Sequence, residues 1–159
     1  MDATPDEPRI APLAPRARHP ALATAFHTFN GHVLFATTLT ARQRELLVLR
    51  VASVREASYK WAQHAVLAGD IGIDELELTR IAAGPDAPGW SPLEAALLAA
   101  VDELIADARI ADDTWAVLAA ELDDQQLVDV VFTVGAYDVL AMAFRSFGVV
   151  LDDDLRVRD

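Results

Sequence analysis

The sequence predicts an all-α fold, and three observations support this prediction. Apolar residues recur at steps of three and four through most of the 159 residues, which is the spacing of one helix face. Several of these runs begin with a residue that can cap a helix, followed three positions later by Glu or Gln. No segment shows the alternation of apolar and polar residues that a half-buried strand needs. We expect six or seven helices in one domain.

The first 19 residues are interpreted as a proline-rich arm that precedes a single helical domain over residues 20–159. The arm contains four prolines, each of which removes a backbone donor and favours extended geometry in its neighbour. From Pro20, apolar side chains predict the buried face of a first helix that ends near Thr37. The residues of this face are Leu22, Phe26, Phe29, Val33 and Ala36.

Residues 40–72 predict two consecutive helices around which the rest of the chain is organised. Thr40 can cap the first of them, with Gln43 three positions later. Apolar residues then cover nearly every side of this helix, so it should be buried. The break falls near residues 56–58, and the second helix should end near residues 69–72, where glycine tolerates a left-handed cap. Five residues fall on one face of the second helix: Ala57, Lys60, Trp61, His64 and Ala68.

Two further helix starts stand on either side of the clearest loop in the chain. Asp74 is expected to cap a short helix that ends near Ala83, before a loop of glycine and proline at residues 84–89. Ser91 should cap the next helix, because a proline follows it directly and a glutamate stands three residues after it.

The last third of the chain predicts two more helices. One begins at Asp112 or Asp113, and a long, nearly apolar helix covers about residues 124–147. The buried side of the shorter helix is predicted to hold Trp115, Leu118, Ala119 and Leu122.

Composition argues against several classes of function. The formal net charge of −12 disfavours nucleic acid and anionic membrane surfaces as partners, because both are bound by clustered Lys and Arg. The chain has no cysteine, so a disulfide framework, a thiol nucleophile and thiolate metal sites are all impossible. There is no phosphate-binding or nucleophile-elbow motif, and the four histidines lack metal-ligand spacing. We expect neither a cofactor nor a metal.

Residues 19–41 contain no Asp, Glu, Lys or Arg, but they do not read as a membrane span. Threonine, histidine, asparagine and glycine interrupt the segment and would lack water within hydrocarbon. The amino terminus also lacks the basic start and continuous apolar run of a signal peptide. The expectation is a cytoplasmic protein without a membrane partner.

Glu45 and His64 form the candidate site. If the two central helices pack side by side, the Glu45 carboxylate could reach the His64 imidazole across a partly dry seam. Each residue also has a structural interpretation. His64 could be satisfied in a core or a subunit seam, and Glu45 could pair with Arg50 or with a neighbouring subunit's arginine.

The central residues resemble the carboxymuconolactone decarboxylase family, which includes the alkylhydroperoxidase D group. The resemblance rests on Arg44-Glu45-Leu46, Leu49-Arg50-Val51-Ala52, Tyr59-Lys60-Trp61-Ala62-Gln63-His64 and Gly72-Ile73, and extends from about His19 to Asp152 with Tyr137 and Ser146-Phe147-Gly148-Val149. Peroxidase-type members carry a glutamate, a Cys-x-x-Cys pair and a histidine. Here the glutamate and histidine match Glu45 and His64, but Ala57 and Lys60 occupy the cysteine positions. Thiol peroxidase activity is therefore not expected.

The resemblance implies an alkylhydroperoxidase D-like bundle that forms homo-oligomers, often trimers or hexamers. It also implies a cofactor-free lyase acting on a small organic acid or lactone, with His64 as the proton shuttle and Glu45 orienting it. The residues expected to hold the substrate are Lys60, Arg50, Tyr59, Trp61 and Tyr137. The alternative is a non-catalytic protein, for small-molecule binding or assembly, that keeps the bundle without the redox cysteines. An open pocket beside His64 favours the enzyme, and a filled one favours the alternative.

Overall fold

The structure is a computed structural model that describes residues 19–148. Within this range it contains seven helices and no strand, which confirms the predicted fold class. The helices are α2 (Pro20–Phe35), α3 (Ala41–Val54), α4 (Ser58–Asp70), α5 (Glu75–Ala83), α6 (Pro92–Asp107), α7 (Asp112–Glu121) and α8 (Asp124–Phe147). Apart from His19, the predicted proline-rich arm lies outside the described residues.

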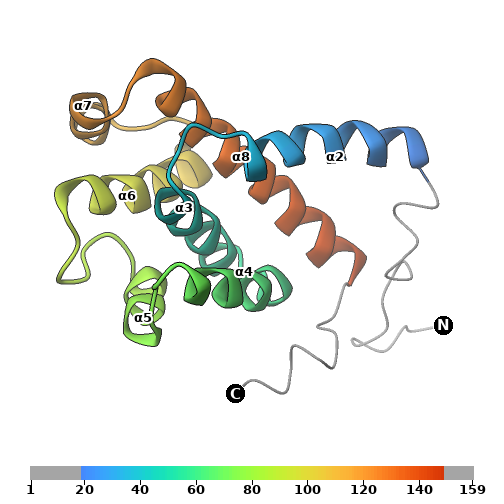
Figure 1. The fold of residues 1–159 in the computed structure, drawn as a ribbon, viewed down its shortest axis with the longest axis horizontal. Coiled ribbons are helices and arrows are strands. Elements are labelled where there is room, and N and C mark those ends of the chain that lie inside the picture. The colour runs from blue at the N-terminus through green and yellow to red at the C-terminus, as the bar shows by residue number, and fades with distance from the viewer. Residues whose placement is uncertain (1–18, 149–159) are drawn as a thin grey trace.

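Helix α3 runs through the middle of the bundle and contacts α4, α5, α6 and α8 (Figure 1). Its residues from Glu45 to Leu49 are all fully buried. The side chains of this helix therefore meet a different neighbour on each side, as its nearly continuous apolar sequence predicts. Glu45 is a carboxylate within this apolar set, so it needs a partner inside the protein.

The predicted helix starts are confirmed, because the side chains that cap them make the expected hydrogen bonds. Capping boxes are present at Thr40, Asp74, Ser91 and Asp123, where each side chain accepts from the amide three residues later and a Glu or Gln returns the bond. Helix α4 ends at Asp70, and Gly72 then turns the chain with a φ of +87°. The boundaries therefore follow from local sequence.

Five apolar residues that were predicted to be buried are exposed in the described chain, namely Leu22, Phe29 and Ala36 near α2 and Trp115 and Ala119 on α7. Leu22 is 60% exposed and Phe29 37% exposed on α2, and Trp115 is 44% exposed on α7. Helix α2 ends at Phe35 and lies along one side of the bundle, where its principal contact is with α8 (Figure 1). Helical spacing correctly marks an apolar face, but it does not say which element of the same chain covers it.

Helix α8 is, by length and composition alone, able to cross a membrane, and no other helix among residues 19–148 is. Core helices of globular proteins pass the same test. In this structure α8 packs along α3 and buries Leu127, Val130 and Val134 in the largest apolar cluster. Its apolar composition is thus partly explained by its place in the core.

Asp129 on α8 anchors the turn between α2 and α3. One of its oxygens accepts hydrogen bonds from the Thr38 amide at 2.6 Å, the Thr38 hydroxyl at 2.8 Å and the Thr37 hydroxyl at 3.0 Å. Burial alone would raise the pKa of Asp129, but these hydrogen bonds and the nearby His32 outweigh burial and lower the pKa. The ionised carboxylate therefore holds the turn that leads into α3.

Substituting Asp129→Asn is expected to lower the free energy of unfolding at neutral pH by about 1–2 kcal/mol, since charge-assisted hydrogen bonds become neutral ones. Because the folded pKa is depressed, this stability is present above the unfolded pKa of about 3.9 and is lost as pH falls through the folded pKa. Urea titrations across acidic and neutral pH would show the difference between variant and wild type shrinking in acid. The exposed Asp86→Asn is the control, and an equal loss there would contradict the assignment.

Candidate functional site

Glu45 and His64 meet in the seam between α3 and α4. The His64 Nδ1 atom lies 2.7 Å from the Glu45 Oε2 atom, and the two residues are 4% and 0% exposed. A carboxylate only accepts, so Nδ1 is the donor in this contact, and the neutral imidazole in that tautomer has its lone pair on Nε2. The contact expected between these two helices is therefore present, and it fixes one tautomer of the imidazole.

Arg44 neutralises the other side of the Glu45 carboxylate. Its Nε and Nη2 atoms each lie 3.2 Å from Glu45 Oε1, and its Nη1 atom donates to the Leu34 carbonyl at 2.7 Å. The prediction that Glu45 pairs with Arg50 is wrong, because Arg44 supplies the cation and Arg50 binds Asp102. Pairing with a neighbouring subunit's arginine stays a prediction. The carboxylate is thus held from both sides, by Arg44 and by His64.

Tyr137 brings a phenol from α8 to the same place. Its ring meets the His64 imidazole edge-on, with 5.1 Å between the ring centroids, and the residue is 2% exposed. Burial raises the pKa of Tyr137 well above its ordinary value, and the negative charge of Glu45 raises it further, against a smaller opposing effect of Arg44. The phenol therefore stays protonated at neutral pH and can donate a hydrogen bond.

Lys60 and Tyr59 lie in the first turn of α4, about one turn before His64. Both contact Gln63 and Phe144. The Lys60 ammonium donates to Gln63 Oε1 at 3.0 Å and lies 5.1 Å from the centre of the Phe144 ring. The Tyr59 hydroxyl accepts from Gln63 at 3.1 Å, and its ring meets Phe144 edge-on. Both residues therefore belong to a cluster at the end of α8 that neighbours the His64 face of α4.

Arg50 lies elsewhere and has a structural role. Its Nε and Nη2 atoms form two hydrogen bonds of 2.7 and 2.8 Å to the Asp102 carboxylate, and its Nη1 atom donates to the carbonyls of Ile81 and Ala82. The guanidinium therefore ties α3 to α5 and α6. The structure does not bring it to the Glu45 and His64 pair, so the expectation that Arg50 holds a substrate has no geometric support.

Ala57, at the N-cap of α4, and Trp61, one turn later, face α3 and α8. Ala57, at the first of the two cysteine positions, is buried at 4% exposure in a small cluster with Ala52 and Ala141. Trp61 is half-buried and packs against this cluster, and its indole also lines a surface groove toward α5. Trp61 thus borders the site on one side, and within residues 19–148 its indole forms no hydrogen bond to Glu45 or His64.

Three residues, Arg55, Asp138 and Arg145, hold the end of α3 against α8. The Arg55 guanidinium forms two hydrogen bonds, of 2.6 and 3.1 Å, to the Asp138 carboxylate. Arg145 donates to the Arg55 carbonyl at 2.7 Å. Because Asp138 directly follows Tyr137, these contacts fix the turn before α4 relative to the part of α8 that carries the phenol.

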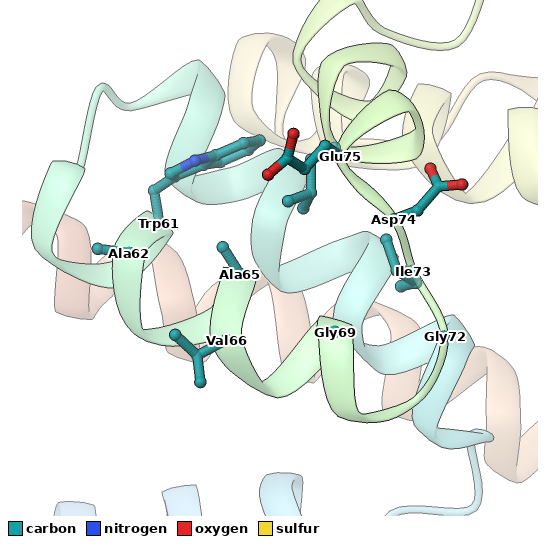
Figure 2. A pocket seen from close by; sticks show the side chains of 10 residues that line it. Trp61, Ala62, Ala65, Val66, Gly69, Gly72, Ile73, Asp74 and Glu75 are labelled. Atoms are coloured by element: carbon teal, nitrogen blue, oxygen red, sulfur yellow. The ribbon is translucent and has the colours of Figure 1, made fainter. Parts of the chain in front are cut away.

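Within residues 19–148, no three His, Asp or Glu side chains lie close enough together to hold a metal ion. Two cavities are described on the surface of this range. One of about 580 Å³ lies between α4 and α5 (Figure 2), and one of about 410 Å³ lies among α6, α7 and α8. Neither is lined by Glu45 or His64, which are enclosed in the isolated chain.

Residues 20–103 match the sequence model of the carboxymuconolactone decarboxylase family. No functionally curated protein matches the sequence. The matched segment spans α2 to most of α6 and contains both Glu45 and His64.

Solved structures with the same fold share 20% or less of their sequence with this chain in the three cases that follow. A protein of unknown function from Agrobacterium tumefaciens, suggested to be the antioxidant defence protein AhpD, is 20% identical with a TM-score of 0.83, over 92% of this chain and 99% of that one. A peroxidase-related protein from Silicibacter is 14% identical with a TM-score of 0.75, over 84% and 72% of the two chains. An AhpD-core, peroxidase-related protein from Ralstonia eutropha is 16% identical with a TM-score of 0.75, over 89% and 76%. These likenesses show a shared helical fold.

Proposed function

Because the chain belongs to the carboxymuconolactone decarboxylase family, we propose that it is a cofactor-free lyase acting on a small organic acid or lactone. The observation that carries this proposal is the buried 2.7 Å contact between His64 and Glu45, with Arg44 on the opposite carboxylate oxygen. Such an arrangement orients an imidazole to move a proton in a site from which water is largely excluded. The chain has no cysteine, so the peroxidase chemistry of a thiol is not available to it.

The residues present match the needs of a decarboxylation. When a carboxylate leaves as carbon dioxide, its bonding electrons pass to the neighbouring carbon and spread onto the lactone carbonyl. A donor must stabilise that oxygen, and a proton must be delivered to carbon. His64 would supply the proton from Nε2 after protonation there, with Glu45 stabilising the imidazolium through Nδ1. Tyr137, which remains protonated and whose ring meets the His64 imidazole, is the proposed neutral donor, and Lys60 is the cation proposed to attract the substrate carboxylate.

A second candidate function is non-catalytic ligand binding or assembly. The specific observation in its favour is that neither described cavity is lined by His64, while His64 and Glu45 satisfy each other. On this account the pair is a structural contact in a packed seam. The two candidates differ in whether substrate can reach Nε2 in the assembled protein.

A parallel substrate test separates these functions. Purified protein would be incubated with carboxymuconolactone, and separately with an organic hydroperoxide and a dithiol reductant. The lyase proposal expects loss of the lactone with equimolar carbon dioxide, and no hydroperoxide consumption above the blank. Absence of lactone turnover together with specific binding of organic acids would favour the second candidate.

We also propose that the chain assembles with copies of itself, as the resemblance implies. Exposed apolar side chains of α2 and α8 adjoin one another, and the Phe29 and Phe132 rings meet edge-on at 6.2 Å. Phe35 is 88% exposed and Phe132 54% exposed in the isolated chain. Apolar surface of this kind is typical of a subunit contact.

Substituting Phe132→Glu is expected to convert the assembly largely to monomer, since it buries a charge in the apolar contact. Light scattering coupled to size exclusion would measure the mass. Leu76→Glu, at an exposed apolar position on α5, is the matched control and should leave the mass unchanged. A wild-type protein that is monomeric at working concentrations would contradict the proposed assembly.

A further inference from the structure

The groove between α4 and α5 is a separate feature from the Glu45 and His64 pair. It has a volume of about 580 Å³ and an apolar floor of small residues from α4, namely Ala62, Ala65 and Gly69 (Figure 2). Trp61 forms one end of the groove, and residues of α5 form the opposite wall. A cavity of this size and lining is typical of a site for a small organic ligand.

The floor has open space around Gly69. A Cβ atom built at Gly69 would meet no atom within 4 Å outside its immediate neighbours. A larger residue at position 69 would therefore not clash with another helix of the described chain. Glycine within a helix lowers helix stability relative to alanine. A larger side chain at this position would extend into the open space of the groove.

Two acidic residues, Asp74 and Glu75, line the groove, and Glu75 is the one that faces Trp61. Figure 2 shows its carboxylate directed toward the Trp61 indole, and both residues line the cavity. No hydrogen bond or ion pair of the Glu75 carboxylate occurs among the described residues, whereas the neighbouring Asp74 carboxylate is used to cap α5. An aromatic face beside a carboxylate attracts a cation, and a chain with a net charge of −12 repels an anion.

We propose that this groove binds an organic cation with an apolar body, such as an arylalkylammonium. The apolar body would lie over Ala62, Ala65 and Gly69, and the ammonium would lie between the Trp61 indole and the Glu75 carboxylate. The groove is not lined by His64, so this binding does not depend on the proposed lyase activity.

Calorimetric titration of the full chain with benzyltrimethylammonium tests the proposal, because neopentylbenzene has the same shape without the charge. The cation should bind and the neutral isostere should bind at least several-fold more weakly. Glu75→Gln and Trp61→Leu should each weaken binding of the cation by roughly 3- to 30-fold, the range that corresponds to one cation–π or charge contact. Gly69→Leu should abolish binding, because the new side chain fills the floor.

Gly31→Leu is the matched control for the added side chain, since a Cβ atom at Gly31 also meets no atom within 4 Å. It should leave binding unchanged, and circular dichroism should show all variants folded. Equal binding of the charged and neutral probes, or undiminished binding in Gly69→Leu, would overturn the proposal. So would absence of binding at millimolar probe. A change of molecular mass in Gly69→Leu alone would show that a second copy of the chain occupies the groove instead.

Discussion

Substituting Glu45→Ala is expected to lower the free energy of unfolding by about 3–5 kcal/mol, the usual effect of removing one member of a buried ionic group. The substitution leaves the Arg44 guanidinium without its carboxylate and the His64 Nδ1 hydrogen without an acceptor. His64 would then hold an unpaired donor in the buried seam, and Arg44 would keep only its contact with the Leu34 carbonyl. Urea denaturation would measure the loss, which corresponds to a fall of roughly 6–20 °C in melting temperature for a chain of this size.

Glu121→Ala, at an exposed position on α7, is the control and should change stability by less than about 0.5 kcal/mol. Replacing Arg44, Glu45 and His64 together by apolar residues of similar size should recover much of the loss, because no buried charge is then left unpaired. A loss below about 1 kcal/mol in Glu45→Ala would contradict the view that its carboxylate organises this seam.

Substituting His64→Asn is expected to reduce decarboxylation by about 10²- to 10⁴-fold, the range associated with loss of a positioned acid or base. Asparagine keeps a donor for Glu45 but has no group that can accept and deliver a proton. The fall should appear in kcat, with KM changed much less, because the lost interaction acts on the transition state. Stability should fall less than in Glu45→Ala, since the carboxylate keeps Arg44.

His27→Asn is the matched control for this substitution, because His27 is exposed on α2. Its activity should equal that of the wild type. Comparable activity in His64→Asn and His27→Asn would assign the proton transfer to another group, and a similar loss in both would point to a general effect on folding or assembly.

Much of the fold follows from local sequence. The caps at Thr40, Asp74 and Ser91 set helix starts that the structure confirms, because a capping side chain satisfies amides within its own first turn. The exposure of Leu22 and Trp115 could not be predicted from local sequence. Their helical spacing is correct, but burial depends on which distant element covers a face, and a second subunit is not part of the isolated chain.

The candidate site was predictable in part. Glu45 and His64 were expected to meet, since each stands on the apolar face of neighbouring helices, and they do meet. Arg44 was missed as the partner of Glu45, although it directly precedes it. Its side chain is also held by the last turn of α2, where it donates to the Leu34 carbonyl. Arg50 could not be placed because its partner Asp102 is 52 residues away on α6.

The most direct test of the central claim is the rate of carbon dioxide release from carboxymuconolactone by wild type and His64→Asn, measured side by side without added metal or cofactor. Our account predicts release by the wild type, equimolar with loss of the lactone, and a fall of at least about 100-fold in the variant. Release that is equal in the two proteins, or a wild type that binds the lactone without releasing carbon dioxide, would contradict it.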